Sequence, residues 1–222
     1  MKLRNVAASV AFLVFSGGVI GIQQAASKQI TLKVQQEMPN ASGISASIPL
    51  KDLPSSLTSN SIKSAQINID SFFLKESGTK TSLKISASEI SKVKPTIIGS
   101  LEVTATISAQ TIAESSEFKD AQIVGNALQV SAGSGGLGKA LLIPKYSDNQ
   151  LYFELQSVLF FGSEIPASSL PAELKNQIKT KSQRTLTPPN GLTVKSVSLS
   201  SKGLSVKMTG SKVQLGTLGS GL

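Results

Sequence analysis

An alternation of apolar and polar residues with a period of two constrains this chain more than any other feature of its sequence. It is clearest in residues 62–73, 83–87 and 101–107. In a strand, successive side chains point to opposite faces of the sheet. The three segments therefore predict half-buried antiparallel strands with one apolar face. In the first of them, the alternation places Phe73 on the apolar face and Phe72 on the opposite face.

The second half of the chain predicts more strands of the same kind. Five are expected, at Ala121–Ala132, Gly138–Pro144, Gln150–Phe161, Leu192–Leu199 and Leu204–Leu215. Turn-forming residues separate several of them: Ser147-Asp148-Asn149, Pro188-Pro189-Asn190-Gly191 and Lys202-Gly203.

Helical segments are few and short. Residues 49–59 predict a short helix or turn, and residues 108–116 predict one helix with Ser108 as its N-cap. Residues 28–38 fit both periods, so a strand and a helix remain open there.

A longer helix, expected from Ser168 to Ser182, carries an apolar stripe and a basic stripe. Leu170, Leu174 and Ile178 recur every four residues and predict its buried face. The basic residues beside them are Lys175, Lys179, Lys181 and Arg184. We expect them to contact a lipid headgroup or an anionic membrane, where each basic residue contributes roughly 1 kcal/mol. The alternative is a solvated outer face that complements the dipole at the helix C-terminus.

These elements together predict an α+β fold. A long curved antiparallel sheet would be wrapped around or packed on one or two helices, because an apolar sheet face must be covered. Any length of that face left unfilled becomes a cavity. Its candidate lining is Ile67, Ile69, Phe73, Leu101, Val103, Ile107, Phe153 and Leu155. Phe160 and Phe161 are expected in the core, with a hydrophobic lip at the cavity mouth as the alternative.

The first 27 residues have the pattern of an export segment. Lys2 and Arg4 precede an apolar run from Val6 to Ile22, and the small residues Ala25-Ala26-Ser27 follow. The run is at the short end of the ~17–25 residues that span a bilayer. We therefore expect either cleavage near residue 27 or an N-terminal membrane anchor. In both cases the protein is exported to the cell envelope.

The remaining chain is expected to form a single domain over residues 28–215, with a flexible tail at 216–222. It contains no cysteine, so no disulfide holds it together. Burial of Ile, Leu and Val must stabilise it, since aromatic residues make up only 5% of the chain.

Composition also restricts the chemistry. With no His and no Cys, the chain lacks a Ser-His-Asp triad, a thiolate nucleophile, the usual zinc sites and a haem His ligand. Its 13 acidic residues are scattered and offer no pair for acid–base catalysis. We predict that it is not an enzyme and that it uses no cofactor and no metal.

The charge of the chain points to an anionic partner. The net charge is +9, and without Lys2 and Arg4 the 20 basic and 13 acidic residues give +7. Outside the cytoplasm such a protein meets anionic lipid headgroups or acidic polymers, not nucleic acid. Arg184 is the only Arg beyond the export segment, which favours diffuse attraction over specific phosphate forks.

One glycine-rich stretch, Gly133 to Lys139, imitates nucleotide-binding loops. It fits both G-x-G-x-x-G and G-x-x-x-x-G-K. Both patterns need a helix to begin at that point, whereas Ala140–Pro144 is a short apolar run that ends in proline. We therefore interpret the stretch as a hairpin loop.

Four stretches, taken in order, resemble a known family. They are the export segment with residues 27–39, residues 44–57 with 64–70, residues 99–108, and the closing segment 189–210. Gly99-Ser-Leu-Glu-Val-Thr-Ala-Thr-Ile-Ser resembles a G-x-A-T-V strand, and Pro189-Asn-Gly-Leu-Thr-Val resembles the start of a closing hairpin. This order is similar to that of the LmeA-like family of actinobacterial envelope phospholipid-binding proteins. Pro49-Leu50 stands where that family usually has Phe-Pro-Phe.

The resemblance implies an elongated fold similar to tubular lipid-binding proteins, which holds an acyl chain along its apolar face. It also implies phospholipid binding and a part in building envelope lipoglycans. We therefore expect a non-catalytic envelope protein whose partners are a phospholipid or other acyl lipid and an anionic membrane surface. The alternative is an extracytoplasmic scaffold or interaction protein with a closed core and no ligand. A protein partner is left open.

Overall fold

The computed structural model describes residues 41–74, 79–115, 120–132 and 138–214, together with Lys28, Thr31, Leu32 and Gln35. The predictions for residues 1–27, for the glycine-rich loop 133–137 and for the tail 216–222 lie outside the described residues. Lys28, Thr31, Leu32 and Gln35 are helical, which confirms the helical alternative at these four positions. Among the described residues, no helix has both the length and the apolar character needed to cross a membrane.

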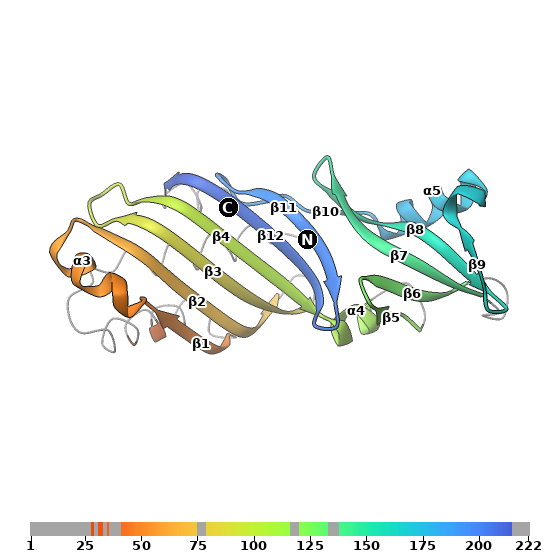
Figure 1. Ribbon diagram of the computed structural model, residues 1–222, viewed down its shortest axis with the longest axis horizontal. Coiled ribbons are helices and arrows are strands. Elements are labelled where there is room, and N and C mark those ends of the chain that lie inside the picture. Colours follow the sequence, from red (N-terminus) through yellow and green to blue (C-terminus); the bar gives the residue numbers. More distant parts are fainter. Residues whose placement is uncertain are drawn as a thin grey trace. The chain divides into compact units, whose positions relative to one another are not determined.

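Strands dominate the described chain, and short helices lie between them (Figure 1). The strands are β1 (Ser42–Ser47), β2 (Ser61–Leu74), β3 (Thr79–Ser91), β4 (Ile97–Ser108), β5 (Gln122–Val124), β6 (Ala127–Ala132), β7 (Gly138–Ser147), β8 (Gln150–Phe160), β9 (Ser163–Pro166), β10 (Arg184–Thr185), β11 (Thr193–Ser200) and β12 (Gly203–Gln214). Among the described residues, the helices with defined bounds are α3 (Leu53–Thr58), α4 (Ala109–Ser115) and α5 (Ala172–Ser182), with the 3₁₀ turns η1 (Leu50–Asp52) and η3 (Ala167–Ser169).

The strands form two sheets. The order in one is β1-β2-β3-β4-β12-β11, and in the other β10-β8-β7-β6-β5, with β9 also paired to β8. The pairs β1–β2, β2–β3, β5–β6, β6–β7, β7–β8 and β8–β9 are antiparallel. The predicted α+β class with a long antiparallel sheet is confirmed.

The chain divides into two compact units. We call residues 2–105, 187–195 and 207–222 the sheet unit. We call residues 106–186 and 196–206 the central unit, because they lie between segments of the sheet unit in the sequence. Strands β4, β11 and β12 contribute residues to both. Because these strands run through both units, the division does not cut the chain into two consecutive segments. The single domain expected over residues 28–215 stays a prediction.

The interior of the sheet unit is built from cross-strand pairs of aliphatic residues. Ile67 lies opposite Ile85, and Ile69 lies opposite Leu83. All four are almost completely buried, while the alternate position Lys84 is exposed. The period of two in the sequence therefore corresponds to one buried face, as predicted.

A register shift in β2 changes which aromatic residue is buried. Between Ile69 and Phe72 the pairing with β3 moves by one residue, as in a β-bulge. Phe72 is buried as a result, so its predicted place on the polar face is wrong. Phe73 lies on β2, but its side chain is outside the described residues.

The core of the central unit joins strands, helix α4 and the β11–β12 hairpin. Its buried members are Ile112, Ala121, Leu128, Val130, Ala140, Leu142, Leu155, Leu199 and Leu204. Residues 121–132 were predicted to form one strand. They form the hairpin β5–β6 instead. The turn between them contains Gly125, whose φ of 61° is easily adopted by glycine.

Several local predictions are confirmed. Ser108 caps α4, since its hydroxyl oxygen accepts a hydrogen bond from the Thr111 N–H at 3.1 Å. Asp148 and Asn149 form the turn between β7 and β8, both with positive φ. Lys139 lies in β7 and not at a helix start, as the hairpin interpretation of its glycine-rich segment requires.

Phe160 and Phe161 do not lie in the core. Their side chains are 43% and 78% exposed, and Phe161 lies in the turn between β8 and β9. The prediction that both belong to the core is wrong. Phe160 is the last residue of β8 and pairs with Ser163 across a tight turn. The two phenylalanines therefore lie at the end of a hairpin and not in the interior of a sheet.

Candidate functional site

One edge of β8 is covered by a helix instead of a strand. On this edge β10 pairs with Gln150 and Leu151, and β9 pairs with residues 157–160. Among the described strands, none pairs with the stretch 152–156 on this edge. Helix α5 packs against β8 and covers that stretch. Covering an edge with a helix keeps it from pairing with another chain.

Ser182, the last residue of α5, fastens the helix to this edge. Its hydroxyl oxygen accepts a hydrogen bond of 2.9 Å from the Phe153 N–H. The hydroxyl in turn lies 2.8 Å from the carbonyl oxygen of Ile178, one turn back in the helix. The backbone N–H of Phe153, which a neighbouring strand would otherwise bind, is satisfied by a side chain.

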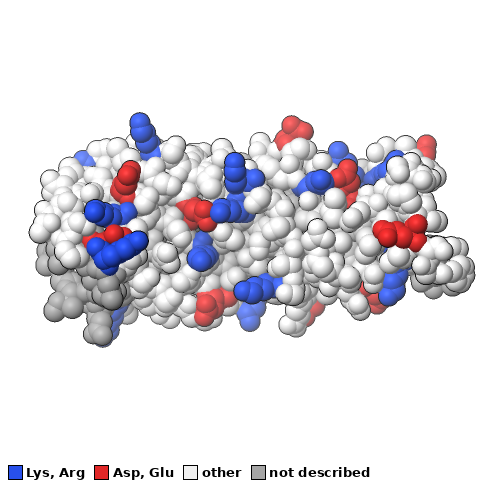
Figure 2. All heavy atoms as spheres, in the orientation of Figure 1, with Lys and Arg blue, Asp and Glu red and all other residues white. Residues whose placement is uncertain are grey.

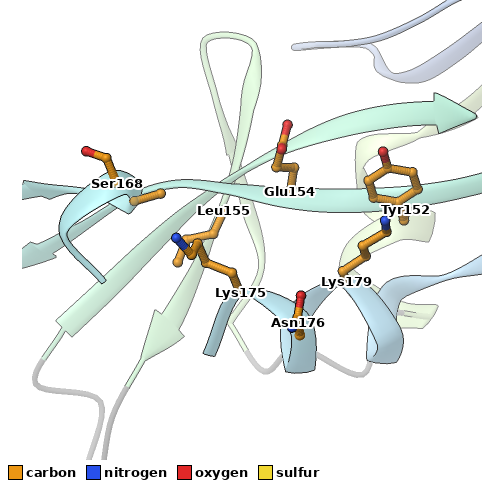
Figure 3. Close-up of a pocket in the computed structure, with 8 residues that line it drawn as sticks. Tyr152, Glu154, Leu155, Ser168, Lys175, Asn176 and Lys179 are labelled. Atoms are coloured by element: carbon orange, nitrogen blue, oxygen red, sulfur yellow. The ribbon is translucent and has the colours of Figure 1, made fainter. Parts of the chain in front are cut away.

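A cleft of about 360 Å³ lies between β8, η3 and α5 (Figure 3). It is lined by Tyr152, Glu154, Leu155, Ala167, Ser168, Lys175, Asn176 and Lys179. Its volume falls in the lower part of the range of ~300–1,000 Å³ that is usual for small-molecule sites. The lining combines two ammonium groups, one carboxylate, a phenol, a serine hydroxyl and an amide with the apolar side chains of Leu155 and Ala167.

The charged side chains of the cleft lie on α5 and on β8. The Lys179 Nζ lies 4.5 Å from the centre of the Tyr152 ring, a cation–π contact. Glu154, the one carboxylate among the lining residues, lies 3.6 Å from the ammonium group of Lys145 on β7. Figure 3 shows the Glu154 carboxylate pointing away from α5 and the Lys175 ammonium group lying on the side of Leu155 and Ser168. The positive charge on the α5 side of the cleft is therefore not neutralised by Glu154.

Tyr146, on β7, has a perturbed phenol. Its hydroxyl donates to the Oδ1 of Asn149 at 3.0 Å and also lies 3.4 Å from the Leu186 carbonyl oxygen. Burial raises the pKa of Tyr146 above its ordinary value. Burial thus favours the neutral form of this phenol over the phenolate.

Helix α5 differs from the prediction in its start and in its buried face. It begins at Ala172, because Ser168 lies in the 3₁₀ turn and Pro171 takes the N-cap position. Leu174 was expected to be buried but is 38% exposed, so that prediction is wrong. Only Leu170 and Ile178 of the predicted stripe pack against the core. The side that faces β8 carries Lys175 instead.

The structure brings together two of the four predicted headgroup residues. Lys175 and Lys179 line the cleft, whereas Lys181 is exposed outside it. The Arg184 guanidinium donates hydrogen bonds of 2.9 Å to the carbonyl oxygens of Lys181 and Gln183. Its position therefore fits the alternative of a cation at the helix C-terminus.

The predicted apolar lining is distributed between the two units. Ile67, Ile69, Leu101 and Val103 lie in the sheet unit and are 0–1% exposed. Their surfaces are already covered by other atoms of the protein. Ile107, Phe153 and Leu155 belong to the central unit, where Ile107 and Phe153 pack against the cluster that contains Leu155. Only Leu155 lines the cleft itself.

Five residues of the cleft were not predicted as site residues: Tyr152, Glu154, Ala167, Ser168 and Asn176. They come from β8, η3 and α5, which are brought together by the edge of the sheet. No spacing in the sequence links them. The one available signal was Ser182 at the end of the predicted helix, since serine often binds nearby backbone groups.

The chemistry of the cleft suits an anion with an apolar substituent. The ammonium groups of Lys175 and Lys179 can pair with the anion, and the Ser168 hydroxyl and Asn176 amide can donate hydrogen bonds. Leu155 and Ala167 offer apolar contact. Figure 2 shows acidic and basic side chains interspersed over the visible face. Within the described ranges, no group of three or more acidic side chains is placed to hold a metal ion.

Comparison of the chain with protein-family models, with curated proteins and with solved structures finds no match. The resemblance to the LmeA-like family therefore stays a prediction from the stretches of sequence described above.

Proposed function

We propose that this chain is a non-catalytic lipid-binding protein of the cell envelope. One observation carries the proposal: the cleft between α5 and β8 combines Lys175 and Lys179 with the apolar side chains of Leu155 and Ala167. A phospholipid has the matching chemistry, since an anionic phosphate is joined to apolar chains. The predicted export segment and the resemblance to the LmeA-like family support the same location and ligand class.

In this proposal the phosphate group lies between the two lysines of α5. Ser168 and Asn176 donate hydrogen bonds to the oxygens of the headgroup. The first methylene groups contact Leu155, and each buried methylene contributes about 0.8 kcal/mol. A cleft of about 360 Å³ accommodates a headgroup and the start of an acyl chain. The rest of the acyl chain must displace side chains that now fill the core of the central unit, or lie on the surface of that unit.

A second function is favoured by a different observation. Ile67, Ile69, Leu101 and Val103 are 0–1% exposed, which is the closed core expected of a scaffold or interaction protein. Such a protein would need no guest molecule to complete its interior. Binding of lipid to the cleft discriminates between the two functions.

The test is calorimetric titration of the full chain with soluble dihexanoyl phosphatidylglycerol and, separately, with inorganic phosphate. Replacing both Lys175 and Lys179 by Gln is expected to weaken binding of the lipid about 30-fold, at roughly 1 kcal/mol for each charge. Lys181→Gln is the matched control, because it removes the same charge from the same helix outside the cleft. It is expected to change the affinity less than about threefold, the effect of a rim charge.

The results separate three explanations. Tighter binding of the lipid than of phosphate, lost in the double variant, supports the proposal. Equal binding of both ligands assigns the cleft to a free anion and removes the lipid. No binding of either ligand leaves the scaffold function.

A further inference from the structure

The turn between β8 and β9 differs from the other two-residue hairpin turns of the same sheet. Asp148-Asn149 joins β7 to β8, and Gly125-Asn126 joins β5 to β6. Asp, Asn and Gly tolerate the left-handed backbone that such turns require. The β8–β9 turn consists of Phe161-Gly162.

Phe161 is an unfavourable residue for this turn. Its φ is 48°, and the φ of Gly162 is 81°. A bulky residue in the left-handed region is strained, whereas Asn is enriched there. With its side chain 78% exposed, Phe161 also gains little from burial. Neither the turn nor the core of the protein accounts for a phenylalanine at this position.

Phe160 and Phe161 form one aromatic tip. Their ring centres are 4.6 Å apart in an edge-to-face arrangement. Residues 160–163 carry no charge. The nearest charged residues on the paired strands are Lys139 on β7 and Glu164 on β9, which both lie opposite Leu159. Burial of the tip therefore requires no charge to leave water.

We propose that the Phe160–Phe161 tip inserts into the interfacial region of an anionic lipid bilayer. The surface area of two phenylalanine side chains on a turn is far smaller than the area of about 1,000 Å² that a specific protein interface buries. A bilayer needs no complementary shape, and apolar side chains bind reversibly at its surface. The net charge is +9, or +7 without Lys2 and Arg4 of the predicted export segment, and either value attracts the chain to an anionic surface. The predicted export segment delivers the chain to such a surface.

This inference goes beyond the proposed function and does not depend on it. The cleft concerns one lipid molecule held by α5, whereas the tip concerns contact with a membrane. A chain that fails to bind lipid in the cleft can still insert its tip.

The direct test uses the absence of tryptophan from the sequence. In Phe161→Trp the new indole is the only one, so its fluorescence reports on the tip alone. Val124→Trp is the control, because Val124 is 49% exposed at the β5–β6 turn. The probes are vesicles of phosphatidylglycerol and phosphatidylcholine, with and without brominated acyl chains. We expect a blue shift and quenching by bromine for the tip indole and neither for the control.

A second variant separates membrane contact from a structural role. Phe161→Asn suits the backbone of the turn and is expected to keep or raise the melting temperature of the full chain. It is expected to weaken vesicle binding about tenfold, the effect of losing one buried aromatic side chain. If Phe161 had a structural role, Phe161→Asn would instead lower the melting temperature of the full chain.

Three outcomes would overturn the inference. The first is vesicle binding without a spectral change of the tip indole, which would assign membrane contact to another part of the chain. The second is a blue shift that grows with protein concentration in the absence of vesicles, which would indicate contact between two copies. The third is unchanged vesicle affinity of Phe161→Asn.

Discussion

The two compact units of this protein use their apolar residues differently. In the sheet unit, aliphatic residues pair across β2 and β3. The predicted lining residues Ile67, Ile69, Leu101 and Val103 are 0–1% exposed. In the central unit, α5 contains no buried residue, and a cleft remains between this helix and β8. The same unit exposes the two phenylalanines of the β8–β9 turn. Both units therefore have a buried core, but the candidate binding surfaces lie in the central unit.

The largest expected effect comes from exchanging a leucine for alanine in each unit. Leu101→Ala removes a side chain that is 1% exposed and is expected to lower the free energy of unfolding by about 2–5 kcal/mol, since a cavity remains. Leu174→Ala, on α5, is expected to change it by about 0.5 kcal/mol or less, as at other surface positions. Urea unfolding followed by circular dichroism measures both. Equal losses would show that α5 is as tightly packed as the sheet unit and would break the comparison.

A smaller effect is expected where α5 is fastened to β8. Ser182→Ala leaves the Phe153 N–H without its 2.9 Å partner and is expected to cost about 1–3 kcal/mol. Ser169→Ala, at an exposed position in η3, serves as the control and is expected to be neutral. Urea unfolding of the two variants tests this. If Ser182→Ala were as stable as the wild type, the covered edge of β8 would not depend on this hydroxyl.

The smallest effect concerns pH and Tyr146. Because burial raises the pKa of this phenol in the folded protein, its contribution to stability is complete below the ordinary value of about 10. It is lost as the pH rises from that value through the raised one. In Tyr146→Phe this part of the alkaline decrease in unfolding free energy is expected to be absent. Unfolding measured from pH 8 to 11 would show parallel curves for both proteins if the phenol were unperturbed.

The sequence predicted elements whose pattern is local. Alternation predicted β2, β3 and β4, and Ser108 predicted the cap of α4. Side-chain periodicity and capping act over a few residues, so a single chain contains the information. The turn at Asp148-Asn149 belongs to the same group.

The errors arose where neighbouring elements decide the outcome. The bulge in β2 buries Phe72, although alternation alone predicted the opposite. Helix α5 meets the edge of β8 through Lys175, Ile178 and Ser182. Ile178 of the predicted stripe therefore packs against the core, whereas Leu174 is exposed. The cleft was predicted only in part for the same reason. Its lysines are visible in the helix pattern, but Tyr152 reaches them only through the pairing of the sheet.

The central claim is that the cleft between α5 and β8 holds an acyl lipid. Native mass spectrometry of the full chain purified from its own host tests it most directly. We predict that the protein carries a bound phospholipid, that this lipid is retained in Lys181→Gln, and that it is lost when Lys175 and Lys179 are both replaced by Gln. A wild-type protein that carries no lipid, and whose melting temperature does not rise with added anionic phospholipid, would contradict the account.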